Sequence, residues 1–242
     1  MANLQADPVG TSLTAYDSST TQAHQLGARM ADGYGRIFRY AKAGAGALVA
    51  GNVVQGPAQV TTHQVMTPAA AAIGATSVTA TLGATNAVTE NQYTGGFLVI
   101  DTTPGNGYAY AIKSHPAGAA STAVVFTLEE PLKVALTTSS RVSLVQNAFN
   151  GVIQSPTTLT GTPVGVAIHP AAAGEYTWVQ THGICPVLCA GTPAVGAAVG
   201  IPGSAAGAVV IDGAATSGLY PVGTMAVTGV DGKNIPCYIR FE

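Results

Sequence analysis

Short apolar stretches separated by glycine, proline or Asp-Gly recur along most of this chain, and they predict β-strands rather than helices. The clearest region covers residues 70–150. There the apolar stretch Gly95–Asp101, the turn residues Pro104–Gly107 and the apolar stretch Tyr108–Ser114 follow one another. A proline that fixes φ, followed by residues that accept a positive φ, is typical of a turn between paired strands. We therefore predict a hairpin over residues 95–113.

Further strands are predicted on both sides of this hairpin. Two apolar stretches follow it, Ser121–Leu132 and Ser139–Asn147, and the first ends at Pro131 because proline cannot donate a hydrogen bond to a sheet. Before it, residues 27–60 alternate with a period of two in places and predict a short β-meander. From residue 151 onward, closely spaced apolar stretches are typical of a compact barrel or sandwich.

The predicted fold is all-β, with two β-rich domains of the sandwich or barrel type and an extended N-terminal arm. Residues 1–26 are small and polar without periodicity, so we expect an arm that is ordered only where something holds it. Residues 27–150 are the first β-rich domain and include the hairpin. Residues 151–242 are predicted to form a small β-barrel domain.

Charge is scarce along the whole chain, since only 8% of the residues are charged where a soluble domain carries about 25%. A freely diffusing monomer usually keeps a charged surface for solubility. The shortage therefore predicts an assembled protein, whose subunits face one another. It is most pronounced from Val142 onward, the segment in which we expect subunit packing. The charged residues there are Glu175, Asp212, Asp231, Lys233, Arg240 and Glu242.

Charge and hydropathy also exclude several partners. The net charge is −2 and no dense basic patch is present, so we expect no nucleic acid partner. No apolar stretch approaches the about 18–20 residues of a spanning helix, so we expect no membrane partner. The N-terminal residues do not resemble a secretory signal and the three cysteines are an odd number, which predicts synthesis in the cytoplasm. A weak basic cluster remains: Arg29, Arg36, Arg39 and Lys42.

The candidate metal ligands are His182, Cys185, Cys189 and Cys237. Zinc takes four nitrogen or sulfur ligands, and two cysteines separated by three residues are an allowed pair. Against a metal, the cysteines lie in apolar, strand-like sequence, and free cysteine is one of the most buried residue types. We favour packing in the core or in an interface, and expect neither a metal nor a cofactor.

No residue pattern predicts an enzyme. The five histidines are scattered, and no serine stands in a G-x-S-x-G motif. Cys185 and His182 lie three residues apart on one predicted strand and so point to opposite faces, as do the adjacent Glu129 and Glu130. The glycine-rich stretches match no phosphate-binding motif. A Ca²⁺ ion bridging loops with aspartates stays open; the candidates are Asp101, Asp212 and Asp231.

Tyr176 and Trp178 share one face of a predicted strand. Two aromatic rings on one face can stack on a sugar, and they can equally anchor a core of small side chains. We favour the anchor, in the core or at an interface, because aromatic residues make up only 6% of the chain.

Two stretches resemble virion proteins of tailed bacteriophages. Residues 90–121, ENQYTGGFLVIDTTPGNGYAYAIKSHPAGAAS, resemble a stretch of sequence found in virion structural proteins, including those of podovirus-like phages of cyanobacteria and other aquatic bacteria. Residues 161–191, GTPVGVAIHPAAAGEYTWVQTHGICPVLCAG, resemble the β-barrel of head decoration, or capsid cement, proteins. In that family the sequence pattern "GVA…AAGE…V…G" lies at the start of the barrel. The resemblance covers residues 34–242 and includes no catalytic signature.

The resemblance implies a protein without an active site that binds the outer surface of the icosahedral capsid. Such proteins bridge neighbouring major capsid subunits, commonly as homotrimers at or near threefold positions, so the implied partners are the major capsid protein and further copies of this chain. The implied location is the capsid surface of the virion. The basic cluster and the arm are then the expected capsid contacts, and residues 70–150 would be an extra domain.

Other virion roles remain open. A tail or fibre component can have the same composition, and a host-glycan-binding virion protein would use Tyr176 and Trp178. A major capsid protein of the usual tailed-phage fold needs a long helix, and no stretch of this chain predicts one.

Overall fold

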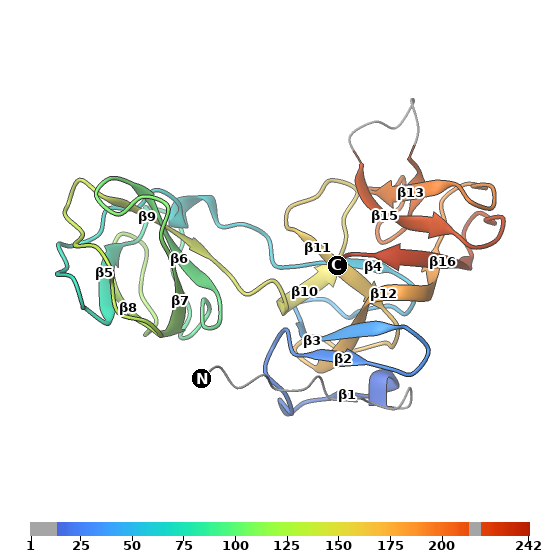
Figure 1. Ribbon diagram of the computed structural model, residues 1–242, viewed down its shortest axis with the longest axis horizontal. Helices are drawn as coiled ribbons and strands as arrows, with labels where there is room; N and C mark the ends of the chain where they lie inside the picture. Colours follow the sequence, from blue (N-terminus) through green and yellow to red (C-terminus); the bar gives the residue numbers. More distant parts are fainter. Residues whose placement is uncertain (1–13, 213–218) are drawn as a thin grey trace. The chain divides into compact units, whose positions relative to one another are not determined.

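The computed structural model describes residues 14–212 and 219–242, and in that part of the chain the all-β prediction is confirmed (Figure 1). Two short 3₁₀ helices, η1 (Thr14–Tyr16) and η2 (Thr61–His63), are the helical segments of the described residues. The chain forms two compact units. We call the second unit, Ala58–Asn147, the inserted unit, and the remaining described residues the terminal unit.

The terminal unit is built on one sheet of eleven strands. Five of these strands, β3, β12, β11, β4 and β10, pair in that order, and β10 pairs back onto β3, which closes a barrel. The strands of the unit are β1 (Ser18–Ser19), β2 (Arg29–Ala31), β3 (Ile37–Ala43), β4 (Val53–Gln55), β10 (Asn150–Gln154), β11 (Pro163–Ala167), β12 (Tyr176–Leu188), β13 (Ala198–Ile201), β14 (Val210–Ile211), β15 (Tyr220–Met225) and β16 (Asn234–Arg240).

The barrel contains mostly small side chains. Eight strands make a barrel just wide enough for side chains to fill, so five leave room for small ones. Alanine and valine therefore predominate among the residues that pack together here. The buried members of this core are Ala41, Ala43, Leu48, Val54, Val152, Val164, Ala167, Ala171 and Val179.

The longest strand, β12, takes part in both halves of the sheet. Its first part pairs with β3 and β11, and from His182 onward it pairs with β16. Beyond β16 the order is β15, β13 and β14. Gly183 adopts a φ of 91°, and the strand continues through it.

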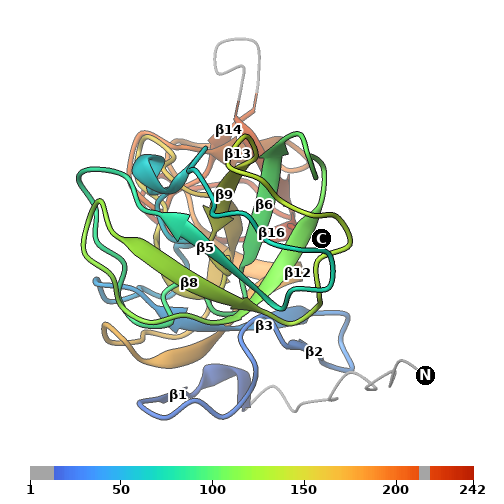
Figure 2. The same ribbon diagram turned by 90° about the vertical axis from the view of Figure 1, so that its left-hand side faces the viewer.

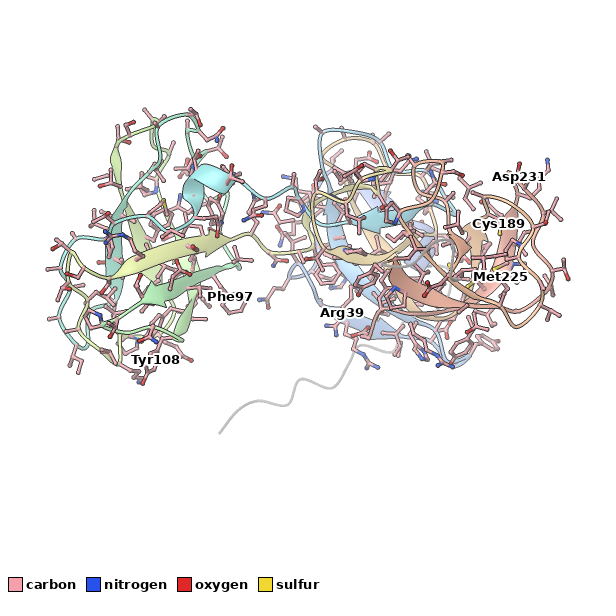
Figure 3. All side chains as sticks on the ribbon, turned by 90° about the horizontal axis from the view of Figure 1, so that it is seen from above. Arg39, Phe97, Tyr108, Cys189, Met225 and Asp231 are labelled. Carbon is pink, nitrogen blue, oxygen red and sulfur yellow. The ribbon has the colours of Figure 1, made fainter. Side chains whose placement is uncertain are left out.

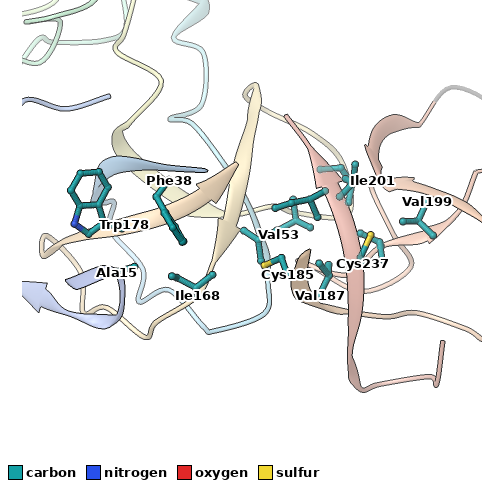
Figure 4. Packing of buried hydrophobic residues seen from close by; sticks show 14 of the residues in the cluster. Ala15, Phe38, Val53, Ile168, Trp178, Cys185, Val187, Val199, Ile201 and Cys237 are labelled. Atoms are coloured by element: carbon teal, nitrogen blue, oxygen red, sulfur yellow. The ribbon is translucent and has the colours of Figure 1, made fainter. Parts of the chain in front are cut away.

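A second core covers the other face of β3 and β12 and continues beneath the strands β13 to β16 (Figure 4). Phe38 and Trp178 lie at one end of this core, and Val199 and Cys237 lie at the other. Ala15 of η1 is fully buried in it. The described part of the predicted arm therefore packs on its own chain, while residues 1–13 lie outside the described residues.

The β1 strand ties this N-terminal segment to the sheet. Its two residues pair antiparallel with Tyr176 and Thr177 at the start of β12. The hydroxyl of Thr177 also donates a hydrogen bond to the carbonyl oxygen of Asp17, over 3.1 Å. Strand pairing and a buried alanine thus hold residues 15–19 on their own chain, where the sequence predicted an arm that is ordered only where something holds it.

The inserted unit is a five-stranded antiparallel sheet in the order β5-β8-β7-β6-β9 (Figure 2). Bridges from Met66 to Val142 of β9 and from Pro68 to Ala80 of β5 cover both of its outer strands. The predicted hairpin over residues 95–113 is present as β6 and β7, which pair antiparallel. The strands are β5 (Ser77–Thr81), β6 (Phe97–Thr102), β7 (Ala109–Ser114), β8 (Ala123–Leu128) and β9 (Arg141–Val145).

The structure divides the chain differently from the predicted domains 27–150 and 151–242. Strands β2, β3 and β4 belong with the C-terminal segment, because β3 pairs with β10 and β12 and β4 pairs with β10 and β11. The boundary expected near residue 150 lies close to one of the two crossings, at Asn147–Ala148. The other crossing, at Pro57–Ala58, was missed, since local patterns do not reveal which strands pair.

Candidate interaction surface

The four basic residues of the predicted cluster lie on β2, on β3 and in the turn between them, and each has different neighbours. Arg36 is engaged by its own chain: its Nε donates to Oδ2 of Asp32 over 2.6 Å, and its Nη1 donates to the Tyr16 hydroxyl over 3.2 Å. Its guanidinium also lies 5.4 Å from the centre of the Phe38 ring. Arg36 therefore helps to hold the β2–β3 turn and η1 in place.

Arg39 forms an ion pair with Glu242 and donates from Nη1 to the carbonyl oxygen of Gly27 over 3.0 Å. The Thr181 hydroxyl donates to the same carboxylate over 2.5 Å. Although burial raises the pKa of Glu242, these hydrogen bonds and the charges of Arg39 and Arg29 hold it below its ordinary value. Arg29 is the cross-strand partner of Arg39. At this point two arginines share one carboxylate.

Lys42 lies with the aromatic residues, on the other face of β3. It is the cross-strand partner of Tyr176 and lies 5.4 Å from the centre of that ring. The Tyr40 ring stacks on Tyr176 at 6.0 Å and meets Trp178 at 5.1 Å. Trp178 is only 5% exposed and belongs to the core of the terminal unit. A ring buried to this extent offers no open face on which a sugar could stack.

The predicted metal ligands are not brought together. Cys185 and Cys237 face each other across β12 and β16, and both are buried, as is Cys189. Burial raises the pKa of all three thiols, that of Cys237 to about 12. His182 lies on the other face of β12, with Nε2 at 3.3 Å from the Tyr238 hydroxyl. No group of three or more His, Cys, Asp or Glu in residues 14–212 and 219–242 could hold a metal ion.

Two of the aspartates considered for calcium are engaged by their own chain. Asp101 accepts a hydrogen bond from the Ser143 hydroxyl over 2.6 Å, within the inserted unit. Asp231 accepts one from the backbone amide of Gly191 over 2.7 Å, within the terminal unit. Asp212 directly follows β14. Asp101 therefore links the paired strands β6 and β9, and Asp231 holds a loop of the terminal unit.

The turn between β2 and β3 is a feature that the sequence analysis missed. Tyr34 at this turn is 87% exposed, the largest value for a large apolar side chain in the described residues. Asp32 builds the turn, because its Oδ1 accepts from the amides of Tyr34 and Arg36 over 2.9 and 3.0 Å. Although burial raises the pKa of Asp32, these bonds and Arg36 lower it overall. The signal available was an aspartate followed by Gly33 and Gly35.

The inserted unit contains a buried chain of hydrogen bonds that was also missed. Nδ1 of His63 lies 2.6 Å from the Tyr93 hydroxyl, and Nε2 of His63 lies 3.2 Å from the carbonyl oxygen of Asn86. The amide of Tyr93 donates to Nε2 of His115 over 3.0 Å, and Nδ1 of His115 lies 2.9 Å from the carbonyl oxygen of Pro116. Both imidazoles are buried. The sequence showed only that a proline follows His115.

Comparison with protein-family models, with curated proteins and with solved structures finds no match to this chain. Among the helices of the described residues, none is long and apolar enough to cross a membrane. What the geometry offers is a set of exposed surfaces: a turn that is held by hydrogen bonds and exposes Tyr34, and the outward faces of the sheets.

Proposed function

We propose that this chain is a structural protein of a virion, a capsid decoration protein that binds the outer surface of an icosahedral shell. In this proposal it acts as a homotrimer and links neighbouring major capsid subunits. The resemblance of residues 90–121 and 161–191 to virion proteins supports it. So does an all-β scaffold in two units, each with its own hydrophobic core.

The observation that carries the proposal is the contrast between little charge and many exposed apolar side chains. Only 8% of the residues are charged, and both units expose large apolar groups, among them Tyr34 at 87%, Ile73 at 66% and Val195 at 63%. Phe97 and Tyr108 of the inserted unit are also exposed (Figure 3). A surface with so little charge is typical of a protein that associates with others, since a freely diffusing monomer usually keeps a charged surface.

A shell of many identical subunits suits such a surface. Each further contact on the lattice forms at a high effective concentration, so weak contacts add up to tight binding. Alanine, valine, threonine and glycine also have few rotamers to lose when an interface forms. Low charge reduces the repulsion between crowded copies.

The proposal is tested with purified chain and with capsid particles assembled from the major capsid protein of the same virus, prepared without this chain. We expect a trimer by light scattering, and saturable binding in proportion to the number of capsid subunits. A monomer that does not bind the particles would contradict the proposal. Saturation at a few copies per particle would instead support a tail or fibre component.

A further inference from the structure

The chain contains two Asn-Gly dipeptides, Asn106-Gly107 and Asn150-Gly151. Both glycines adopt nearly the same backbone conformation, with a φ of 88° at Gly107 and of 92° at Gly151. Asn-Gly is the dipeptide at which asparagine most readily loses its side-chain amide, because glycine leaves its own backbone nitrogen unshielded. The two sites share this chemistry, so only their surroundings in the fold can make them differ.

The first dipeptide lies in the turn between β6 and β7. Asn106 and Gly107 are both exposed, and nothing lies within 4 Å of a Cβ added to Gly107. The amide of Gly107 donates to the carbonyl oxygen of Ile100 over 3.0 Å, and the next bond of the turn, from the amide of Tyr108 to the carbonyl oxygen of Gly105, is longer at 3.3 Å. An exposed turn at the end of a hairpin can open locally at a low free energy.

The second dipeptide lies in the closed barrel. Asn150 and Gly151 are half-buried residues of β10, which pairs with β3 on one side and with β4 on the other. Asn150 stands opposite Lys42, whose amide donates to the carbonyl oxygen of Phe149 over 2.8 Å. Asn150 can rearrange only when this part of β10 leaves β3. Strands of a core open at a cost that approaches global unfolding.

We propose that Asn106 is a site of spontaneous deamidation and that the barrel protects Asn150 from the same reaction. The backbone nitrogen of Gly107 attacks Cγ of Asn106 and gives up its proton to water. A new N–Cγ bond closes a succinimide ring, the Cγ–Nδ2 bond breaks, and the side-chain nitrogen leaves as ammonia. Water then adds to either ring carbonyl and opens the ring to aspartate or isoaspartate. The co-reactant is water, and nothing is oxidised or reduced.

The reaction changes the turn in two ways. Either product adds a negative charge to a chain whose net charge is −2 and in which only 8% of the residues are charged. Isoaspartate also lengthens the backbone by a methylene group, because the chain then runs through the former side chain of Asn106. Turn geometry fixes the register of the strands on either side, so the longer backbone acts on the pairing of β6 with β7.

The test incubates the full chain at mildly alkaline pH and follows both dipeptides over time by peptide mapping with mass spectrometry. We expect Asn106 to convert about tenfold or more faster than Asn150, since a turn opens locally at a lower free energy than a barrel strand. In urea the two rates should agree within about twofold, because the difference in opening free energy comes from the fold. Similar rates in the folded chain, or a faster reaction at Asn150, would overturn the proposal.

Two variants identify the reacting side chain by anion exchange, on which the added charge appears as a new acidic species. Asn106→Gln should abolish this species in the folded chain, because the longer glutamine side chain closes its ring much more slowly. Asn150→Gln is the matched control and should leave the species unchanged. An acidic species that persists in Asn106→Gln would overturn the assignment. If Asn150→Gln fails to fold, the peptide map of the wild type decides the matter alone.

Discussion

At the scale of single residues, Gly183 determines whether β12 can continue from β3 to β16. Its φ of 91° lies in the region that favours glycine. An added Cβ would lie 2.8 Å from the carbonyl oxygen of Gly35 and 3.2 Å from Cα of Arg36. Both neighbours are backbone atoms, which cannot move aside as a side chain end can. The position therefore needs glycine for its conformation and for its space.

We predict that Gly183→Ala lowers the free energy of unfolding by about 1–3 kcal/mol, the usual cost of a strained backbone position. The control is Gly33→Ala, where nothing lies within 4 Å of an added Cβ and φ is not positive. This control should stay within about 0.5 kcal/mol of the wild type. Urea unfolding followed by fluorescence of Trp178, the single tryptophan, measures both. Equal stability of the two variants would contradict the account.

The sequence allowed some residue-level features to be predicted and hid others. The period of two placed His182 and Cys185 on opposite faces, and β12 has them so. The role of Asp32 was missed although Asp32, Gly33 and Gly35 are a turn signal, because a turn signal does not show which backbone amides the carboxylate accepts from. Pairing of Arg39 with Glu242 joins residues at opposite ends of the chain, which no local pattern shows.

At the scale of elements, the buried hydrogen bonds of the inserted unit hold His115 neutral. Its Nε2 accepts from the Tyr93 amide, so the proton stands on Nδ1 and is donated to the carbonyl oxygen of Pro116. If Nε2 of His115 also carried a proton, its N–H would face the N–H of Tyr93, and two donors cannot form a hydrogen bond with each other. Burial lowers the pKa of His115 below 6.5 and His63 lowers it further, although Pro116 and Glu90 act in the opposite direction.

Acid should therefore loosen the inserted unit. Above pH 6.5, the pKa of His115 in the unfolded chain, neither the folded nor the unfolded state binds the proton, and His115 costs no stability. As the pH falls from there toward the lower pKa of the folded state, the unfolded chain binds a proton that the folded chain does not bind, so the free energy of unfolding decreases. The loss is at most about 1.4 kcal/mol per pH unit for one group. We predict that the hydrogen-exchange protection of the Tyr93 amide, corrected for intrinsic rates, falls between about pH 7.5 and 5.5.

Two comparisons identify the source of this effect. His115→Gln offers an uncharged acceptor in place of the imidazole and should flatten the pH dependence at Tyr93. The Val53 amide of the terminal unit, which donates to Gly207, should show no matching change. Protection of Tyr93 that is the same at both ends of the pH range would contradict the assignment.

Strands that depend on local turns were predictable, and strands that depend on distant partners were not. The hairpin of β6 and β7 has its turn residues, Pro104–Gly107, between two apolar stretches, so the whole motif lies within one window of sequence. The full length of β12 was not predictable, because Gly183 resembles a turn residue. Only the pairing with β3 and β16 shows that the strand goes on.

At the scale of the whole molecule, fewer charged side chains are available to a partner than the composition suggests, because some are paired within the chain. Two of the arginines are already paired, Arg36 with Asp32 and Arg39 with Glu242. The charge left for partners is therefore smaller than the composition suggests. The composition predicted association with a basic cluster as the contact, but pairing within the chain already engages two of its four members.

The division into units was the part of the fold that the sequence concealed. Residues 27–57 read as part of the first β-rich domain because they are adjacent to it in sequence. In the structure β3 and β4 complete a barrel whose other strands come after residue 148. The chain leaves the terminal unit and returns to it at neighbouring points: β4 and β10 pair antiparallel, and an added Cβ on Gly56 would lie 2.8 Å from the carbonyl oxygen of Ala148.

We predict that the terminal unit folds without the inserted unit. A Gly-Ser linker of about four residues in place of Ala58–Asn147 can join Pro57 to Ala148, because these two points of the terminal unit lie close together. A short loop also costs less entropy to close than a long one. The shortened chain should unfold cooperatively, with a free energy within about 1 kcal/mol of the terminal unit in the full chain. Trp178 fluorescence and near-ultraviolet circular dichroism measure this. A shortened chain that exposes Trp178 and lacks a cooperative transition would show instead that the barrel requires Ala58–Asn147 to form.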